Sequence, residues 1–542
     1  MRVGQKMPEN ETFHYIVVGA GSAGAALANR LSAERKNRVL LLEAGQASHR
    51  WGSIPAGYAK MLKDPTANWC YDSTPEEGTG NRALPAPRGK LLGGSSAING
   101  LVFVRGQAQD YDTWAQMGNR GWSYQDVLPV FKRLENYEGG ADEFRGDSGP
   151  LRVTNPDESG PLYDAIIKAA GEAGVPHNRD YNGPSQEGIS MSQATIANGK
   201  RMSTAACYLD PIRDRDNLKI QTGALSESLI LEGKRCVGVR YSVNGEQREM
   251  RAEGEVIISC GSFNSPQLLE LSGIGQPERL KALGIVVQHA LPGVGENLRD
   301  HFAPRTRWAI NAKGYTYNDR GRGLGLFAQA MKYALQKKGM LGIPAAPLRA
   351  FVKSREGLEA PDLLLGWVPM LYEINAKGAP KLSKQSGLTC YAHVMRPESK
   401  GSVHIKEACP GVQPDIRYNF LSSPPDQDLT VQAIRTARAI MTAPAMAELG
   451  VTELLPGSGE TSDDAILAWA RAFGETTYHP VGTCKMGSDR MAVVDDKLRV
   501  HGIDGLRIAD ASIMPTLISG NTNAPSIMIG EKASDLVLQD TR

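Results

Sequence analysis

The stretch that decides the fold is YIVVGAGSAG, residues 15–24. Its first four residues are apolar and mostly β-branched, which is typical of a buried parallel strand. Three glycines follow in the spacing G-x-G-x-x-G, and the Ala- and Leu-rich residues 23–33 predict a helix. Residues 39–42, with the sequence VLLL, predict a second buried strand. We therefore expect a strand, a tight turn, a helix and a second parallel strand.

The glycine spacing indicates a dinucleotide-binding turn. Gly19 permits the tight turn, Gly21 lets a pyrophosphate approach the backbone, and Gly24 lets the helix pack closely on the strand. Ser22 and Ala23 begin the helix, whose N-terminus offers unpaired N–H groups and a partial positive charge to phosphate.

Glu43 is expected to bind the sugar of the same nucleotide. It ends the second strand, where a carboxylate can accept hydrogen bonds from both ribose hydroxyls. The motif alone does not separate FAD from NAD. A single fingerprint at the N-terminal end of the chain is what an FAD protein with one nucleotide would show.

Composition excludes several classes of partner. Lys+Arg 61 against Asp+Glu 59 leaves a net charge of +2, and no basic block interleaves with aromatic residues, so no nucleic-acid partner is predicted. No run approaches the roughly twenty apolar residues of a transmembrane segment. Seven scattered cysteines, none in a CxxC pair, predict neither a disulfide framework nor a zinc site. The expected location is cytoplasmic.

Residues 306–469 differ in character from the rest of the chain. They contain strand-like stretches at 361–370 and 387–406 and a candidate amphipathic helix at 427–448. We expect a separate domain here, built on an antiparallel sheet.

Four further stretches have loops rich in glycine, serine and asparagine, which can press their backbone against a flat ligand. They are residues 87–106 (PRGKLLGGSSAINGLVFVRG), 261–275 (GSFNSPQLLELSGIG), 292–298 (PGVGENL), and a C-terminal stretch with YHPVGTCKMG at 478–487, ADAS at 509–512 and NTNAP at 521–525. Together with the N-terminal fingerprint, they make the chain resemble the glucose–methanol–choline (GMC) oxidoreductases over nearly its whole length. Within that family it resembles the bacterial choline-, sorbose- and alcohol-dehydrogenase-like branch.

The resemblance implies an α/β fold with two parts. One is a discontinuous Rossmann-like FAD-binding domain, expected at residues 11–153, 198–305 and 470–542. The other is a substrate-binding domain, expected at residues 154–197 and 306–469, with a mostly antiparallel sheet flanked by helices.

The resemblance also implies the residues that bind FAD. Ser226 is expected to contact the adenine through its backbone, a contact that survives the valine found there in many family members. Ile98 stands where some relatives carry a histidine bonded to the flavin, so we predict noncovalent FAD. The expected cofactor residues are Gly19, Gly21, Ser22, Ala23, Gly24, Glu43, Gly94, Ser96, Asn99, Val102, Ser226, Asp510, Ala511 and Thr522.

Alcohol oxidation removes a proton from oxygen and a hydride from the adjacent carbon, so a base near the hydroxyl is needed. Neutral histidine suits that role near pH 7. The resemblance places the catalytic histidine at His479 and the second catalytic residue, histidine or asparagine in this family, at Asn521. Asn523 is the alternative for the second position. His301 is expected to be structural. Acids and histidines do not cluster at ligand spacings, so no metal is predicted.

The sequence therefore predicts FAD-dependent oxidation of a small-molecule alcohol to the carbonyl by hydride transfer to flavin N5. The alcohol is a primary alcohol, polyol, sugar or aromatic alcohol. The electron acceptor is O2 or a quinone-like molecule, with a dehydrogenase favoured over an oxidase. A non-redox GMC-fold lyase, flavin photochemistry on fatty acids and a flavin-containing scaffold are alternatives that the pair His479 and Asn521 disfavours. The oligomeric state stays open.

Overall fold

The computed structural model describes residues 12–156, 159–374 and 380–540. Strand β1 (Thr12–Val18) lies near the middle of the largest sheet of the described residues. Its strand order is β10-β2-β1-β13-β12-β11, and β28 also pairs with β13. Strands β10, β2, β1, β13 and β28 are parallel, whereas β11 and β12 are antiparallel. The other strands are β2 (Val39–Glu43), β10 (Leu218–Thr222), β11 (Ala224–Glu232), β12 (Arg235–Val243), β13 (Glu246–Ile258) and β28 (Leu506–Ile508). The strands predicted at 15–18 and 39–42 are confirmed.

The parallel strands end together at one edge of this sheet. Val18 pairs with both Leu42 and Ile258, and Ile258 pairs with Ile508. The residues that follow each strand therefore gather at this edge, although they come from four distant parts of the chain. In an open α/β sheet this carboxyl edge is where ligands bind.

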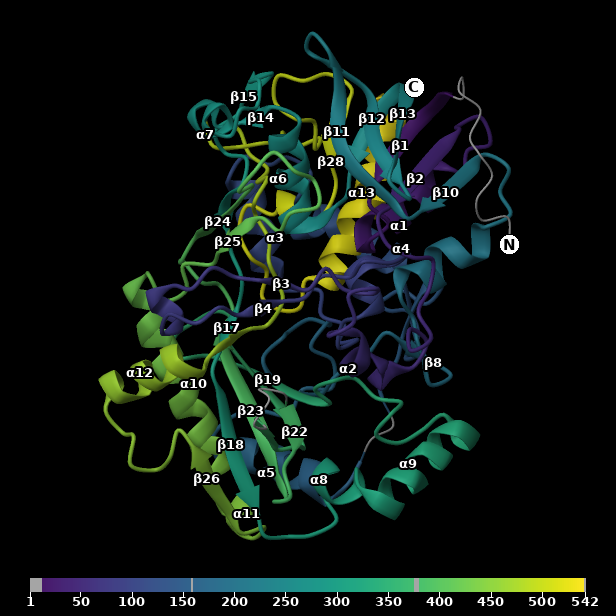
Figure 1. Cartoon of the computed structure of the whole chain (residues 1–542). Helices are drawn as coiled ribbons and strands as arrows, with labels where there is room; N and C mark the ends of the chain where they lie inside the picture. Colours follow the sequence, from purple (N-terminus) through teal and green to yellow (C-terminus); the bar gives the residue numbers. More distant parts are fainter. Residues whose placement is uncertain (1–11, 157–158, 375–379, 541–542) are drawn as a thin grey trace.

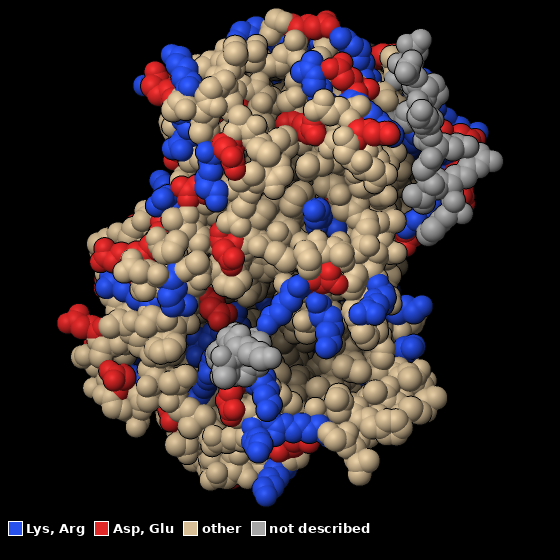
Figure 2. Space-filling model, viewed as in Figure 1, with Lys and Arg blue, Asp and Glu red and all other residues tan. Residues whose placement is uncertain are grey.

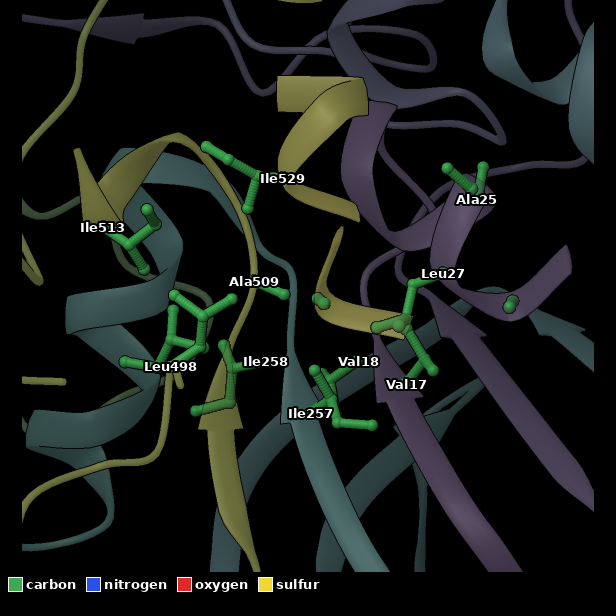
Figure 3. Close-up of a cluster of buried hydrophobic side chains, with 14 of the residues drawn as sticks. Val17, Val18, Ala25, Leu27, Ile257, Ile258, Leu498, Ala509, Ile513 and Ile529 are labelled. Atoms are coloured by element: carbon green, nitrogen blue, oxygen red, sulfur yellow. The ribbon is translucent and has the colours of Figure 1, made fainter. Parts of the chain in front are cut away.

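Helices α1 (Ser22–Leu31) and α13 (Asn523–Asp540) pack on each other beside this sheet (Figure 1). Apolar side chains from β1, β13 and α1 meet in one buried cluster (Figure 3). The Glu531 carboxylate of α13 is fully buried and accepts hydrogen bonds from Arg30 at 2.8 Å and from the Tyr208 hydroxyl at 2.9 Å. The ion pair with Arg30 holds α13 against α1, because a buried carboxylate without its partners would be strongly destabilising.

The predicted glycine turn joins β1 to α1. Gly19 has φ +100°, and a Cβ there would lie 2.5 Å from the Ser259 carbonyl oxygen. A Cβ on Gly24 would lie 1.9 Å from the Gly19 carbonyl oxygen. Helix and strand therefore approach more closely than any side chain allows, as the sequence predicted.

The second sheet has six antiparallel strands in the order β26-β18-β23-β20-β19-β7 and forms the lower part of the molecule in Figure 1. This confirms the expected antiparallel sheet. The strands are β7 (Gly188–Met191), β18 (Arg305–Ile310), β19 (Leu348–Val352), β20 (Leu363–Val368), β23 (Gly387–Val394) and β26 (Val451–Leu455).

Side chains alternate between the two faces of this sheet. Leu363, Leu365 and Trp367 belong to the apolar cluster that packs on α5 (Pro161–Glu172) and α10 (Pro424–Met441). The residues between them face the other way, because successive side chains of a strand point to opposite faces. The face away from the helices is therefore free to line a site.

The helix predicted at 427–448 is wrong at both ends. Helix α10 begins at Pro424 and ends at Met441, and a separate helix α11 (Pro444–Ala447) follows. Ala443, which precedes Pro444, is extended with ψ 156°. Proline disfavours the helical conformation for the residue before it, so the helix is interrupted at Ala443.

Strand β7 joins the second sheet from the segment 154–197, and β18 begins at Arg305. On this basis we retain the domain boundaries 11–153, 198–305 and 470–542 against 154–197 and 306–469 as a proposal. The other helices are α2 (Tyr58–Met61), α3 (Ala108–Gln116), α4 (Tyr124–Leu134), α6 (Gly261–Leu271), α7 (Pro277–Ala282), α8 (Tyr317–Arg320), α9 (Gly323–Gln336) and α12 (Asp463–Phe473). Short strands are β3 (Tyr71–Asp72), β4 (Pro85–Ala86), β5 (Glu135–Tyr137), β6 (Leu151–Val153), β8 (Ile196–Ala197), β9 (Lys200–Arg201), β14 (Ile274–Gly275), β15 (His289–Ala290), β16 (Glu296–Leu298), β17 (Phe302–Ala303), β21 (Tyr372–Ile374), β22 (Pro380–Leu382), β24 (Gly401–His404), β25 (Asp415–Arg417) and β27 (Glu475–Thr476).

Replacing Gly24 with alanine should destabilise the protein, because the added methyl group overlaps the Gly19 carbonyl. We expect a loss of about 1–3 kcal/mol in the free energy of unfolding, the usual cost of overpacking. Gly171→Ala is the matched control, since Gly171 lies within α5 and a Cβ there meets nothing within 4 Å. Denaturant unfolding of both variants tests this, and equal stability of Gly24→Ala and wild type would contradict it.

Candidate active site

A cavity of about 1040 Å³ lies between the carboxyl edge of the parallel sheet and the helix-free face of the antiparallel sheet. The residues after β1, β2, β13 and β28 line one part of it. Side chains of β19, β20 and β23 line another. Its volume is at the upper end of small-molecule sites, which is enough for a dinucleotide together with a small substrate.

The first part of the cavity presents the N-terminus of α1. Gly19, Gly21, Ser22 and Ala23 all line it, whereas Gly24 is not among the lining residues and serves the packing of α1 on β1. No side chain caps α1 and its first turn has no acid, so its N–H groups remain available to an anion. A Cβ on Gly21 would meet only the Ser259 carbonyl oxygen, at 4.0 Å, so open space for a ligand adjoins this backbone.

Glu43 lies beside this helix end and lines the cavity. Its carboxylate accepts hydrogen bonds from the Ala20 N–H at 3.0 Å and the Gly45 N–H at 2.9 Å. Burial raises the pKa of Glu43 to about 7, and these two hydrogen bonds oppose that rise. The carboxylate oxygens retain lone pairs for ribose hydroxyls. Ser226 also lines the cavity, and its buried hydroxyl has no partner in the part of the chain that the structure describes.

The other predicted cofactor residues divide into two groups. Gly94, Asn99, Val102, Asp510, Ala511 and Thr522 line the cavity, as does Ile98. Ser96 is not among the lining residues. Its hydroxyl donates to the Gly93 carbonyl at 2.6 Å and lies 3.0 Å from the Thr204 hydroxyl, so it holds the loop together.

Asp510 organises the cavity wall. One of its oxygens accepts from the Gly261 N–H at 2.9 Å and from the Ser265 hydroxyl at 2.6 Å, and the other accepts from the Ser512 N–H at 2.8 Å. These bonds tie the first turn of α6 to the C-terminal segment.

His479 and Asn521, predicted from segments forty-two residues apart, meet in this cavity. His479 Nε2 lies 2.8 Å from Asn521 Nδ2. Arg349 Nη1 donates to Asn521 Oδ1 at 3.0 Å. A guanidinium can only donate, so the amide oxygen faces Arg349 and the amide N–H faces His479. Asn523, the alternative for the second position, instead accepts a hydrogen bond from the Ser22 hydroxyl at 2.8 Å.

The hydrogen bonds of the other ring nitrogen, His479 Nδ1, determine the tautomer of His479. His301 Nε2 lies 2.7 Å from the Met395 carbonyl oxygen and must donate to it, which leaves His301 Nδ1 as an acceptor. His479 Nδ1 lies 3.0 Å from that atom, so it carries the proton of the neutral ring. The Thr477 hydroxyl, 2.9 Å from His479 Nδ1, donates to the His301 carbonyl at 3.3 Å and is a second acceptor. His479 Nε2 therefore keeps its lone pair, the form that a base requires.

The backbone around His479 is held in a sharp turn. Tyr478 has φ +68°, an uncommon conformation for a residue with a side chain. Its carbonyl accepts from Arg88 at 2.7 Å and its N–H donates to the Thr476 hydroxyl at 2.7 Å. Asp300 accepts from the N–H groups of His301 and His479, each at 2.8 Å. Burial raises the pKa of Asp300 to about 6.

The electrostatic environment keeps His479 neutral. Burial lowers the pKa of His479 well below its ordinary value, and repulsion from His393, Arg88 and Arg349 lowers it further. Burial also lowers the pKa of His393 to about 4. Because an imidazolium is disfavoured here, His479 is in its proton-accepting form at neutral pH.

Sequence reasoning missed several residues around this pair. Arg349, Tyr391 and His393 line the cavity, and His301, expected to be structural, directly contacts His479. For Arg349, Tyr391 and His393, the signal in the sequence was the alternation of apolar and polar residues along their strands. In Leu348-Arg349-Ala350 the two apolar residues pack in the helix-facing cluster, as do Cys390 and Ala392 on either side of Tyr391. A polar residue between two buried apolar residues points to the other face.

The residues present fit FAD. The α1 N-terminus suits the pyrophosphate, Glu43 and the unpartnered Ser226 hydroxyl suit the adenosine part, and the cavity continues to the pair His479 and Asn521. When bound, FAD supplies a two-electron acceptor for hydride. Among the described residues, no group of three or more His, Cys, Asp or Glu side chains is placed to hold a metal.

An edge suited to a dinucleotide shares one cavity with a buried, neutral histidine, an arrangement expected of a dinucleotide-dependent oxidoreductase. Comparison with known families then places this chain within the class. Residues 13–303 match the N-terminal profile of the GMC oxidoreductases and residues 397–530 match the C-terminal profile, so the chain belongs to the GMC oxidoreductase family. The family membership and fold that the sequence predicted are confirmed.

Individual relatives agree with this assignment. An oxygen-dependent choline dehydrogenase from Photobacterium profundum is 40% identical over 540 residues, which cover 98% of this chain and 94% of that protein. Pyridoxine 4-oxidase from Mesorbium loti has a TM-score of 0.87 at 29% identity, covering 97% of this chain and 99% of that one. Formate oxidase from Aspergillus oryzae RIB40, in a variant that affects FAD modification, has a TM-score of 0.90 at 25% identity, covering 98% and 99%. The chain is an FAD-dependent alcohol oxidoreductase.

Replacing Arg349 with methionine should raise the pKa of His479, because one of the positive charges that disfavour the imidazolium is removed. The base is active when unprotonated, so the rate of flavin reduction falls toward low pH as the base takes up a proton. In this variant that fall, the acid limb of the pH profile, should occur at a higher pH. Anaerobic stopped-flow measurements across pH test this. Arg349→Lys should move the limb less, since it retains the charge. Lys381→Met, at another lining residue, is the control. An acid limb at the wild-type pH in Arg349→Met would contradict the assignment.

Proposed function

We propose that His479 is the catalytic base and Asn521 the residue that holds the substrate oxygen. The observation that carries this is the pair itself: in the cavity wall the unprotonated His479 Nε2 accepts a hydrogen bond from the Asn521 amide N–H, with 2.8 Å between the two nitrogens. A hydroxyl that reaches Nε2 finds an amide donor beside it. Proton acceptance and charge stabilisation then act on one oxygen atom.

In the proposed step the hydroxyl proton would pass to His479 Nε2, and bound FAD would supply the two-electron acceptor for the hydride on the carbon that bears the hydroxyl, so that the C–O bond becomes a carbonyl. Two electrons leave with the hydride, so the balance needs no other reactant. The proton on Nδ1 is shared with His301 and Thr477, which keeps the ring oriented as positive charge develops on it.

We propose an uncharged alcohol as substrate. Arg88, Arg349 and Lys381 line the cavity and form no salt bridge with a carboxylate in the described part of the chain, whereas the Arg305 charge is balanced by Glu475 at 2.9 Å. A quaternary ammonium near Arg349 would be repelled in this low-dielectric site. Leu364, Val368, Met370 and Tyr391 add apolar and aromatic surface, which suits a primary or aromatic alcohol. Choline, named for the curated relatives, is therefore not the favoured substrate.

We further propose that FAD is bound noncovalently, since the aliphatic Ile98 lines the cavity where some family members have the bonded histidine. The proposed electron acceptor is a quinone-like molecule, with O2 as the other candidate. All seven cysteines are free, which is consistent with the proposed reducing, cytoplasmic location.

The first experiment is an anaerobic titration with an alcohol panel while flavin absorbance is followed. The panel comprises choline, sorbose, pyridoxine, benzyl and furfuryl alcohols, short alkanols and polyethers. We expect an uncharged alcohol to bleach the flavin, and His479→Ala to slow that reduction at least about a hundredfold, the usual size of an acid–base contribution. His177→Ala, at an exposed histidine, is the control. If the flavin of His479→Ala were reduced at the wild-type rate, the assignment of His479 as base would be refuted. If choline alone bleached the flavin, the proposal of an uncharged alcohol would be refuted.

Acid precipitation tests the mode of FAD binding. Without a bonded histidine, denaturation should release all of the yellow colour into the supernatant. Wild type and Ile98→Leu should behave alike. Colour that stays with the washed pellet would show a covalent link and overturn the proposal.

A further inference from the structure

Helix α9 (Gly323–Gln336) projects from the lower part of the molecule, at the right in Figure 1, and exposes apolar side chains to solvent. The exposed fractions are 88% for Leu324, 64% for Phe327, 41% for Met331 and 76% for Leu335. Their spacing of three to four residues places them along one face of the helix. A helix in a water-soluble protein normally turns such a face inward, so this face indicates a binding surface.

The opposite side of α9 is attached to the rest of the protein. Tyr333 is the buried residue of this helix, and its hydroxyl donates to the Gly199 carbonyl at 2.9 Å. This hydrogen bond attaches the side of α9 that lies opposite the exposed stripe, so the stripe faces outward.

The charged residues of α9 and of the segments that flank it, within residues 320–355, are all basic. Residues 320–338 contain Arg320, Arg322, Lys332, Lys337 and Lys338, and no Asp or Glu occurs anywhere from 320 to 355. Arg320 and Arg322 donate to backbone carbonyls, and neither forms a salt bridge with a carboxylate among the residues that the structure describes. In Figure 2 the lobe where Figure 1 places α9 is mostly tan, with blue side chains along its upper border. An apolar stripe flanked by basic residues is complementary to an anionic lipid surface.

The segments that flank helix α9 contact or line the active-site cavity. Arg322 donates to the Leu382 carbonyl, and Leu382 and Lys381 line the cavity. After the helix, the chain reaches Ala345 and Ala346, which line it as well. Whatever binds α9 therefore lies close to the cavity.

We propose that α9 docks on the surface of a bilayer containing anionic phospholipid, with its apolar stripe inserted at the acyl boundary and its basic residues among the headgroups. The association is peripheral, because within the described residues no helix has the length and apolar character to cross a membrane. A second copy of this chain is a poorer occupant, since pairing two α9 stripes would bring like charges together. Docking would place the cavity beside the lipid, where a lipid-dissolved quinone-like acceptor is available.

Vesicle flotation of the FAD-loaded protein tests this without any need for turnover. We expect it to bind vesicles of equal phosphatidylcholine and phosphatidylglycerol at least about tenfold more tightly than phosphatidylcholine alone, and to dissociate as salt rises. The variant Leu324→Gln/Phe327→Gln/Leu335→Gln should lose at least about tenfold of that binding. Its rate with a soluble dye acceptor should stay unchanged, because these side chains face solvent.

Two comparisons keep the test specific. Met117→Gln/Val286→Gln removes exposed apolar side chains elsewhere on the surface and should bind vesicles like wild type. Lys332→Glu should weaken binding to the anionic vesicles only. Absence of wild-type binding to the anionic vesicles, or equal binding by the triple variant, would overturn the proposal. The proposal would also be overturned if the wild type formed a dimer, the triple variant were a monomer and neither bound vesicles.

Discussion

The close contact between β1 and α1 is the constraint on which the rest of the site depends. It exists because Gly19 and Gly24 have no side chains to separate strand from helix. It directs the α1 N-terminus into the cavity, and it gives α13 a surface on which to pack through Arg30 and Glu531. Because α13 begins at Asn523, the same packing positions Asn521. The turn that suits the cofactor therefore also fixes one member of the proposed catalytic pair.

The proposed catalytic pair is ordered by hydrogen bonds whose donors and acceptors can be assigned in only one way. At one end the Met395 carbonyl can only accept, and at the other the Arg349 guanidinium can only donate. Between them, each neutral imidazole must donate from one nitrogen and accept at the other. The lone pair on His479 Nε2 follows from these two ends. Burial and nearby positive charge lower the pKa of His479, so this arrangement persists at neutral pH.

Sequence reasoning correctly predicted the elements whose physical signal is local. The strands at 15–18 and 39–42, the glycine turn and the antiparallel character of the second sheet all follow from periodicity and glycine spacing, and the structure has them. The helix at 427–448 was wrong because Pro444 acts on the residue before it, a local signal that the amphipathic pattern obscured. Arg349 and His393 were missed, although alternation along β19 and β23 carried the information. Ser96 does not itself line the cavity and its hydroxyl bonds to Gly93 and Thr204, so its expected place near the cofactor stays a prediction.

The sequence by itself determined the dinucleotide turn, the family and the two residues of the proposed catalytic pair, because each lies in a short motif whose chemistry needs those residue types. Only the tertiary structure decided that His301 and Arg349 complete the pair, since they come from segments far apart in the chain and contact it through packing. It also decided which His479 nitrogen is unprotonated and that the apolar face of α9 is exposed. Hydrogen-bond direction and burial are properties of the assembled neighbours, so no local pattern encodes them.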